Sequence, residues 1–174
     1  MIKNKAHEFF MDKALLQAKV ALKKNEVPVG AVVVDSDGNI LARGYNKIES
    51  TGCQTAHAEV LAIQKACKKI GGWRLDDCWI YVTLEPCLMC LGLIQLSRMK
   101  GVVFGASSDL FGFGYGKKED CRKYKKDLII KGGLKEQQSI DILKKFFERL
   151  RKKRKGDSGT KSRIARKGQK KVIG

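Results

Sequence analysis

The stretch "DCWIYVTLEPCLMCLGLIQLSRMKGVVFGA", residues 77–106, decides the fold. It reads as a buried strand over 77–85, a helix over 87–98 that starts at Pro86, and a short apolar strand over 101–106. Proline suits the first helical turn because it presets φ and has no N–H to leave unpaired. Strands that alternate with helices in this way call for a mixed or mainly parallel sheet with helices packed on its faces.

Further helices and strands flank this stretch. The turn residues "DGN", at 37–39, lie between two apolar runs and predict a hairpin over 27–46. Apolar residues at helical spacing indicate amphipathic helices elsewhere, and a last strand follows a glycine-rich loop over 105–120. The helices are expected at 5–24, 58–70 and 134–152, and the last strand at 126–133. These elements predict the α/β class, with a central mixed five-stranded sheet and helices on both faces.

The charge is distributed unevenly along the 174 residues. Lys and Arg number 36 against 18 Asp and Glu, a net charge of +18, and residues 151–174 hold eleven basic residues and one acidic residue. We therefore expect one folded domain over 1–152 and a basic tail over 153–174 that is too polar to fold alone and is disordered. Clustered Lys and Arg favour a polyanionic partner, most simply nucleic acid, because they neutralise phosphates and release counterions. For the tail, a solvated charge run is the alternative.

No part of the sequence indicates export or a membrane span. The first twenty residues are charged throughout and lack the apolar core of a signal peptide, and no window reaches about 18 consecutive apolar residues. We therefore expect a cytoplasmic protein that does not enter a membrane. In that compartment the six cysteines are reduced thiols, metal ligands or catalytic groups.

Cys87 and Cys90 stand three residues apart at the start of a predicted helix. This spacing puts both sulfurs on one face, and the N–H groups and dipole of the first turn favour thiolates. A zinc ion suits two such ligands, with a redox dithiol and a structural pair as alternatives.

The stretch "TAHAE", residues 55–59, adds His57 and Glu59 to the cysteine pair. The joint pattern H-x-E…P-C-x-x-C is far rarer than its parts and matches the signature of zinc-dependent deaminases.

The number of ligands indicates what the zinc would do. His57, Cys87 and Cys90 make three, which is typical of a catalytic site because the fourth position stays open for water. Cys67 lies about 15 Å along the same predicted helix from His57 and cannot share the ion. Cys53 is close enough in sequence to remain a candidate ligand.

Glu59 is the candidate catalytic residue. Zinc lowers the pKa of its bound water from about 16 to about 7, and a neighbouring carboxylate can carry the released proton. The chemistry that this pattern indicates is hydrolytic deamination, in which water adds to an amine-bearing ring carbon and ammonia leaves.

Longer stretches carry a family pattern over about residues 5–152. They are "NEVPVGAVVV", "GYN", "TAHAE", "VTLEPCLMCLGLIQLSRMKGVVFGA" and "LKKFFERLR". Together they resemble the bacterial tRNA-specific adenosine deaminases. The resemblance implies zinc-dependent conversion of the wobble adenosine of a tRNA anticodon to inosine, one zinc ion per chain and a homodimer. It also implies a three-layer α/β/α cytidine-deaminase-like fold, and the tRNA anticodon stem-loop as the partner.

The resemblance further assigns residues to the substrate. Asn46 of "GYN" would contact the base or ribose of the target nucleotide. Val29 and Ala56 would line the pocket around that base. At the last helix, Phe146 and Arg149 would meet the anticodon loop.

Two departures from the family pattern lie on the substrate side. The chain reads "CQTAHAE" where the family usually has Asp-Pro before Thr. In the loop after "VVFGA", Ser108 stands where an acid is common and Asp109 follows one place later, so Asp109 is the candidate acid for substrate contact. Phe111 and Phe113 in the same loop either stack on bases or cover the core.

Two other functions remain alternatives at this point. A small-molecule base or nucleotide deaminase, acting on guanine, cytosine or deoxycytidylate, would use the same zinc site. A basic RNA-binding module with a structural zinc is the second alternative. A charge of +18 gives no advantage with a neutral free base, and a structural zinc site needs neither Glu59 nor an open ligand position.

Overall fold

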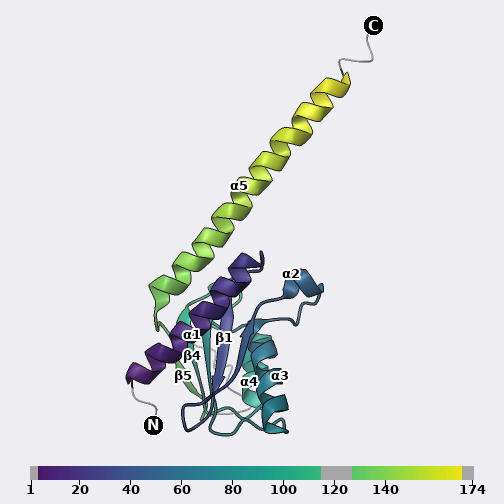
Figure 1. Ribbon diagram of the computed structural model, residues 1–174. Helices are drawn as coiled ribbons and strands as arrows, with labels where there is room; N and C mark the ends of the chain where they lie inside the picture. Colours follow the sequence, from purple (N-terminus) through teal and green to yellow (C-terminus); the bar gives the residue numbers. More distant parts are fainter. Residues whose placement is uncertain (1–3, 115–126, 170–174) are drawn as a thin grey trace.

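The computed structural model describes residues 4–114 and 127–169, with side chains described between 6 and 153 outside that gap (Figure 1). The helices are α1 (Asn4–Lys23), α2 (Ile48–Thr51), α3 (Ala58–Ile70), α4 (Leu88–Leu96) and α5 (Glu136–Gln169). The strands are β1 (Gly30–Val34), β2 (Ile40–Tyr45), β3 (Trp79–Leu84), β4 (Gly101–Ala106) and β5 (Ile129–Lys131). None of the helices in these ranges combines the length and the apolar character that a membrane span requires.

The strands form one mixed sheet in the order β2-β1-β3-β4-β5. β1 is antiparallel to both β2 and β3, whereas β3, β4 and β5 run parallel. The predicted mixed five-stranded sheet is therefore confirmed. Because β3 and β4 are parallel, their carboxyl ends meet at one edge of the sheet, where Leu84 pairs with Ala106. The segment after Leu84 leads directly to Cys87, so the cysteine pair begins at this edge.

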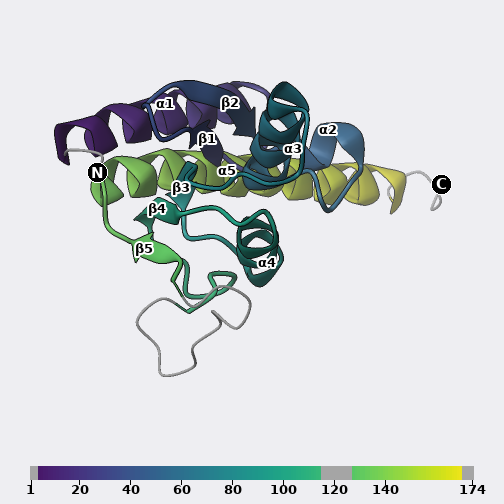
Figure 2. The same cartoon turned by 90° about the horizontal axis from the view of Figure 1, so that it is seen from below.

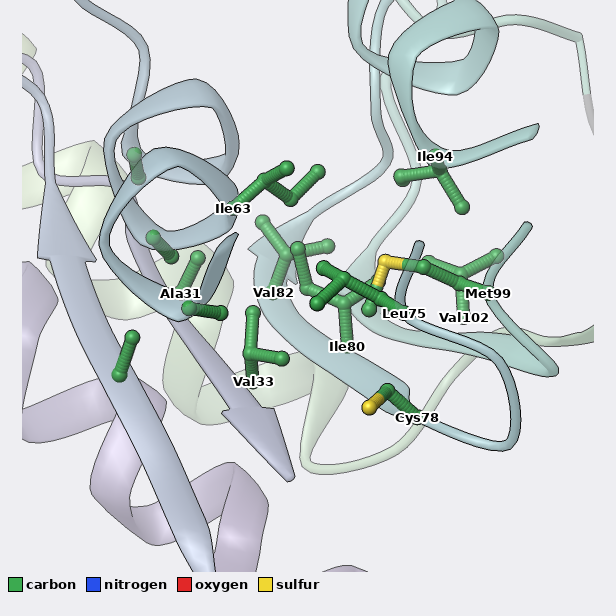
Figure 3. Packing of buried hydrophobic residues seen from close by; sticks show 14 of the residues in the cluster. Ala31, Val33, Ile63, Leu75, Cys78, Ile80, Val82, Ile94, Met99 and Val102 are labelled. Atoms are coloured by element: carbon green, nitrogen blue, oxygen red, sulfur yellow. The ribbon is translucent and has the colours of Figure 1, made fainter. Parts of the chain in front are cut away.

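Helices cover both faces of the sheet and make three layers. Figure 2 shows α3 and α4 together on one side of the sheet, with α1 and the start of α5 on the other. The core under α3 and α4 packs Ile63 and Ile94 against Ile80 and Val82 of β3 (Figure 3). On the other face, α1 packs against Tyr81 and its neighbours on β1 and β4. The alternation of faces along β3 follows from the two-residue period of a strand.

Gly44 sets the close approach of α3 to the sheet. A Cβ atom at this position would lie 2.2 Å from the Ala58 carbonyl oxygen at the start of α3. Only glycine leaves room for that contact, so the first turn of α3 lies directly against β2. This first turn carries His57 and Glu59, and the small residue on β2 therefore helps to position both.

The short helix α2 was not predicted from the sequence. It holds four residues, Ile48–Thr51, too few to show a helical period. Its first backbone N–H groups donate hydrogen bonds to a residue more than twenty positions earlier in the chain. Glu26, which is 1% exposed, accepts hydrogen bonds from the N–H groups of Ser50 at 2.8 Å and Glu49 at 3.0 Å.

The last helix differs from the prediction. α5 begins at Glu136 and continues to Gln169, whereas the sequence predicted a helix that ends at residue 152 and a disordered tail. Figure 1 shows α5 extending away from the sheet. Lys and Arg, which are frequent in the extension, have high helix propensity and favour its helical backbone. The division into a domain over 1–152 and a tail over 153–174 stays a prediction.

Candidate metal centre

Segments from several strand ends converge on the edge where β3 and β4 terminate. Because β1 is antiparallel to β3, the residue before β1, Val29, lies at the same edge as the residue after β2, Asn46. The backbone joins them directly, since the Asn46 N–H donates to the Val29 carbonyl oxygen at 3.2 Å. Cys87 follows β3 at this edge. The predicted site residues are therefore brought together by sheet topology.

His57, Cys87 and Cys90 form a compact group of potential ligands. His57 Nδ1 lies 3.8 Å from Cys87 Sγ and 3.6 Å from Cys90 Sγ. The three ligand atoms all lie within 4.8 Å of one another, and no other such group exists among the described residues. Cys53 is exposed on the surface and does not belong to it.

The distances between these atoms fit zinc. In a tetrahedral site with bonds of about 2.0–2.3 Å, neighbouring ligand atoms lie about 3.6 Å apart. The His57–Cys90 and His57–Cys87 separations of 3.6 and 3.8 Å match this value. Two sulfurs and one imidazole nitrogen are also the donor types that zinc prefers. With three protein ligands, the group has the composition of a catalytic site.

Two helix N-termini point at this group. His57 is the N-cap residue of α3 and Cys87 that of α4, both with extended backbone, and neither side chain caps its own helix. Cys90 lies in the first turn of α4 and is fully buried. The side chains thus turn toward one another instead of toward the free N–H groups. The positive ends of both helix dipoles stabilise negative charge here, which favours thiolates.

The protonation of the thiols agrees with this arrangement. A hydrogen bond from the Cys90 thiol lowers the pKa of Cys87 to about 4. The same hydrogen bond, together with burial, raises the pKa of Cys90. The contact with Cys87 raises the pKa of His57. One thiolate is therefore already favoured between the two helix ends.

Glu59 lies on the first turn of α3, two residues after His57, and is 3% exposed. Its Oε2 atom is buried and has no hydrogen-bond partner among the described residues. Burial raises the pKa of this carboxyl group. An unpartnered carboxyl oxygen inside a protein is costly, so a partner such as a ligand, a water or a substrate is expected at this position.

The predicted pocket residues lie beside the metal group. Val29, Asn46 and Ala56 are all buried, with exposures of 5%, 5% and 6%. Asn46 Oδ1 accepts a hydrogen bond from the Ala58 N–H at 2.8 Å, which fixes the side chain to the first turn of α3. Its Nδ2 atom makes no hydrogen bond within the described chain and can donate to a substrate.

The other predicted substrate residues lie in three different environments. Asp109 is exposed, in the loop after β4. Phe146 is buried at 6% exposure on α5, whereas Arg149, one turn later, is exposed. Their contacts with substrate stay predictions.

Sequence reasoning missed Glu85, which stands between β3 and Cys87. This side chain is 6% exposed, and its two oxygens accept hydrogen bonds from the N–H groups of Ser108 and Gly114, each at 2.9 Å. A charged residue directly before Pro86, after the apolar run of β3, was the available signal. Nothing in the local sequence indicates its partners, which lie more than twenty residues later in the chain.

The comparisons with known proteins agree with this geometry. Residues 4–106, more than half of the chain, match the family model described as the cytidine and deoxycytidylate deaminase zinc-binding region. The chain belongs to this deaminase family. The match contains both the His57–Glu59 segment and the Cys87–Cys90 pair, so the zinc site is the family's own.

Similar proteins include tRNA-specific adenosine deaminases and guanine deaminases. The tRNA-specific adenosine deaminase of Bacillus subtilis is 40% identical over 158 residues, which are 85% of this chain and 92% of the relative. A solved structure from a study of tRNA:A34 deaminases at the tRNA wobble position superposes with a TM-score of 0.70 at 35% identity, over 78% of this chain and 99% of the other. A guanine deaminase structure from Bacillus subtilis is 45% identical but covers 58% of this chain and 64% of its own, with a TM-score of 0.55.

Proposed function

We propose that this protein is a tRNA adenosine deaminase that hydrolyses the wobble adenosine of a tRNA anticodon to inosine. The observation that carries the proposal is the buried carboxyl group of Glu59, whose Oε2 atom has no hydrogen-bond partner among the described residues, beside a three-ligand metal group. It occurs in a chain that matches a tRNA-specific adenosine deaminase over 92% of that relative's length. The guanine deaminase structure, by contrast, is matched over only 64% of its own length.

Zinc held by His57, Cys87 and Cys90 would supply a bound water that ionises near neutral pH. The chain itself must carry protons, because deamination takes them from water and delivers them to a ring nitrogen and to the departing amine. The buried Oε2 atom of Glu59, which has no partner among the described residues, supports a role for Glu59 in this transfer. Burial raises the pKa of Glu59, and a carboxyl group with a raised pKa accepts a proton more readily near neutral pH.

The protein orients the base through residues that are already fixed. Asn46 is held by its bond to the Ala58 N–H, so its amide needs no rearrangement to donate to the nucleotide. Val29 and Ala56 are buried beside it and supply an apolar wall. A preorganised pocket of this kind lowers the entropy lost when the base is bound. The base must leave the anticodon stack to reach it, as in other enzymes that act on flipped bases.

Charge supports a tRNA substrate over a free base. The chain carries a net charge of +18, which attracts a polyphosphate and gives guanine, a neutral base, no added affinity. We place the reaction in the cytoplasm, in line with a tRNA substrate.

We further propose that the protein is a homodimer through α4. Large apolar side chains on this helix are exposed, with Leu88 at 61%, Met89 at 41% and Leu96 at 58%. A second copy that packs on α4 would remove them from water. α4 also carries Cys90, so a partner on this helix would lie close to the metal group.

A substrate panel tests the proposed function. Purified protein is incubated with bulk tRNA, deoxycytidylate and guanine, and the products inosine, deoxyuridylate and xanthine are quantified. We expect inosine from tRNA alone. Xanthine or deoxyuridylate without inosine would assign the same zinc site to a small-molecule substrate. No deamination at all, with zinc bound, would favour a basic RNA-binding module.

A further inference from the structure

The β4 loop, residues 107–114, is held to the segment that delivers Cys87. It leaves β4 at the same sheet edge where β3 ends, because Leu84 pairs with Ala106 in the parallel ladder. Glu85, the first residue after β3, is almost completely buried. Its Oε2 accepts from the Ser108 N–H and its Oε1 from the Gly114 N–H, both at 2.9 Å. One carboxyl group therefore binds two points of the loop that are six residues apart in the chain, Ser108 and Gly114.

Two further contacts make this attachment tight. A Cβ atom on Gly112 would lie 2.4 Å from the Glu85 carboxyl carbon, so the loop backbone passes directly over that side chain. The Phe113 N–H donates to the Pro86 carbonyl oxygen at 2.9 Å, and the Phe113 ring meets Phe104 edge-on at 6.2 Å. Phe113 thus covers the core, which is one of the two roles that the sequence allowed for it; the other was to stack on bases.

The tip of the loop has the opposite character. Leu110 is 85% exposed and Phe111 is 76% exposed, the two largest exposures among the large apolar side chains described. The Phe111 N–H is bonded to Ser108 Oγ at 3.3 Å, which ties the tip back to the residue that Glu85 holds. An anchored loop that presents an aromatic ring to water, and that is bonded to the segment leading to Cys87, is suited to receive a ligand with a flat apolar face.

We propose that Glu85 is a positioning residue that holds the β4 loop so that Phe111 stacks on a nucleobase next to the target adenosine. The inference rests on the proposed function, since it takes RNA as the ligand. When the target base is flipped into the zinc pocket, the neighbouring bases lose a stacking partner. An exposed aromatic ring replaces it without reading sequence. Glu85 does not touch the substrate and acts through the loop.

Kinetics of Glu85→Gln on an anticodon stem-loop RNA test this role. Glutamine keeps one acceptor oxygen and presents an amide N–H₂ to the other backbone N–H, so one of the two bonds is lost. We expect KM to rise about tenfold, the size of effect that a lost hydrogen bond to a charged group produces. The kcat and the zinc content should stay within about twofold of wild type, and amide hydrogen exchange of residues 108–114 should be faster.

A merely structural role would give a different result. If Glu85 only supported the Cys87 segment, the variant would lose zinc and kcat while KM stayed unchanged, and this would overturn the proposal. An unchanged KM despite faster exchange in the loop would also overturn it, because the loop would then be held but not used.

Two more variants make the test specific. Leu110→Ser combined with Phe111→Ser should raise KM to a similar extent, and adding Glu85→Gln to it should raise KM no further. Effects that multiply would show that Glu85 does not act through the tip. Asp35→Asn is the matched control. Its carboxyl also accepts two backbone N–H bonds, from Asp37 and Asn39, but in the turn at the opposite sheet edge, so KM should not change.

The same variants separate this inference from the proposed function. If wild-type protein forms no inosine, the proposed function fails, and affinity for the same stem-loop RNA is measured by fluorescence anisotropy instead. A roughly tenfold weaker affinity of Glu85→Gln and of the tip variant would support the loop's role in RNA binding. Equal affinities would contradict it.

Discussion

His57 Nδ1 and Cys90 Sγ lie 3.6 Å apart although 33 residues separate them in the chain. Each belongs to the N-terminus of a different helix, α3 and α4, and both helices lie on the same face of the sheet. The sheet edge and the glycine contact under α3 bring the two helix ends together. This relationship, with Cys87 as the third member, is the structural basis of the metal site.

Removal of these three side chains should remove the metal. We expect about one zinc per chain in the wild-type protein and none in the triple variant His57→Ala, Cys87→Ala, Cys90→Ala, as measured by elemental analysis of dialysed protein. Cys53→Ala and Cys67→Ala are controls that should keep the full zinc content, because neither residue belongs to the group. Full retention of zinc by the triple variant would refute the assignment.

Glu59→Gln should separate catalysis from metal binding. We expect the variant to keep its zinc and to lose about 10²- to 10⁴-fold in turnover, the range contributed by a proton-transferring side chain. Because burial raises the pKa of Glu59 by penalising its charged form, a neutral amide should not lower the melting temperature. Glu8→Gln, at an exposed position on α1, is the control for the substitution type. A variant with near wild-type turnover would show that another group moves the proton.

The exposed side chains on α4 predict a specific dimer contact. Sedimentation of the wild-type protein at micromolar concentration should give a dimer, and Leu96→Glu should shift it to a monomer by placing a charge in an apolar contact. Leu16→Glu on α1 is a matched control, because Leu16 is also exposed, at 48%, but lies on the other face of the sheet. A wild-type protein that sediments only as a monomer would contradict the contact, and so would equal effects of both variants.

Truncation after Lys152 tests the role of the basic tail, which lies outside the family resemblance. The zinc content and the chemical step should be unchanged, because the site lies at the sheet edge. Affinity for tRNA should fall evenly across different tRNAs, and its salt dependence should become shallower. Each lost phosphate contact removes about 0.7–0.9 from the slope of log affinity against log salt.

A second tail variant shows whether the positive charge of the tail or its helical backbone is responsible for tRNA affinity. Replacement of the Lys and Arg residues in 153–174 by Gln keeps good helix formers in the extension of α5 and should reproduce the truncation. An unchanged slope in both variants would make the tail a solubilising charge run. A loss confined to one tRNA would mean that the tail reads more than phosphate.

Local patterns in the sequence were sufficient for most of the fold and for the metal group. The helix predicted over 58–70 is α3 residue for residue, because its apolar period, its start and its glycine stop are all local signals. The ligands His57, Cys87 and Cys90 were found because short fixed spacings on helix starts already constrain where side chains point. The resemblance added the family, which the family model and the tRNA-specific adenosine deaminase relative confirm.

Contacts between distant segments account for what sequence reasoning missed. His7 on α1 is 5% exposed and its Nδ1 lies 2.8 Å from the Tyr81 hydroxyl on β3, a contact that no local pattern in the sequence indicates. The short helix α2 depends on Glu26, and the β4 loop depends on Glu85, each a buried carboxyl that bonds backbone N–H groups more than twenty residues away. No hydrophobic period or short motif indicates a hydrogen bond between a carboxyl group and backbone N–H groups so far away in the chain.

Product analysis at the wobble position distinguishes a tRNA adenosine deaminase from other deaminases with the same zinc site. A tRNA with adenosine at the wobble position is incubated with the wild-type protein and with Glu59→Gln, digested to nucleosides and short fragments, and analysed by mass spectrometry. We expect inosine at the wobble position only, with other adenosines of the same tRNA unchanged and no product from Glu59→Gln. If the zinc-loaded protein instead left the tRNA unmodified and converted free guanine to xanthine, the proposed function would be wrong.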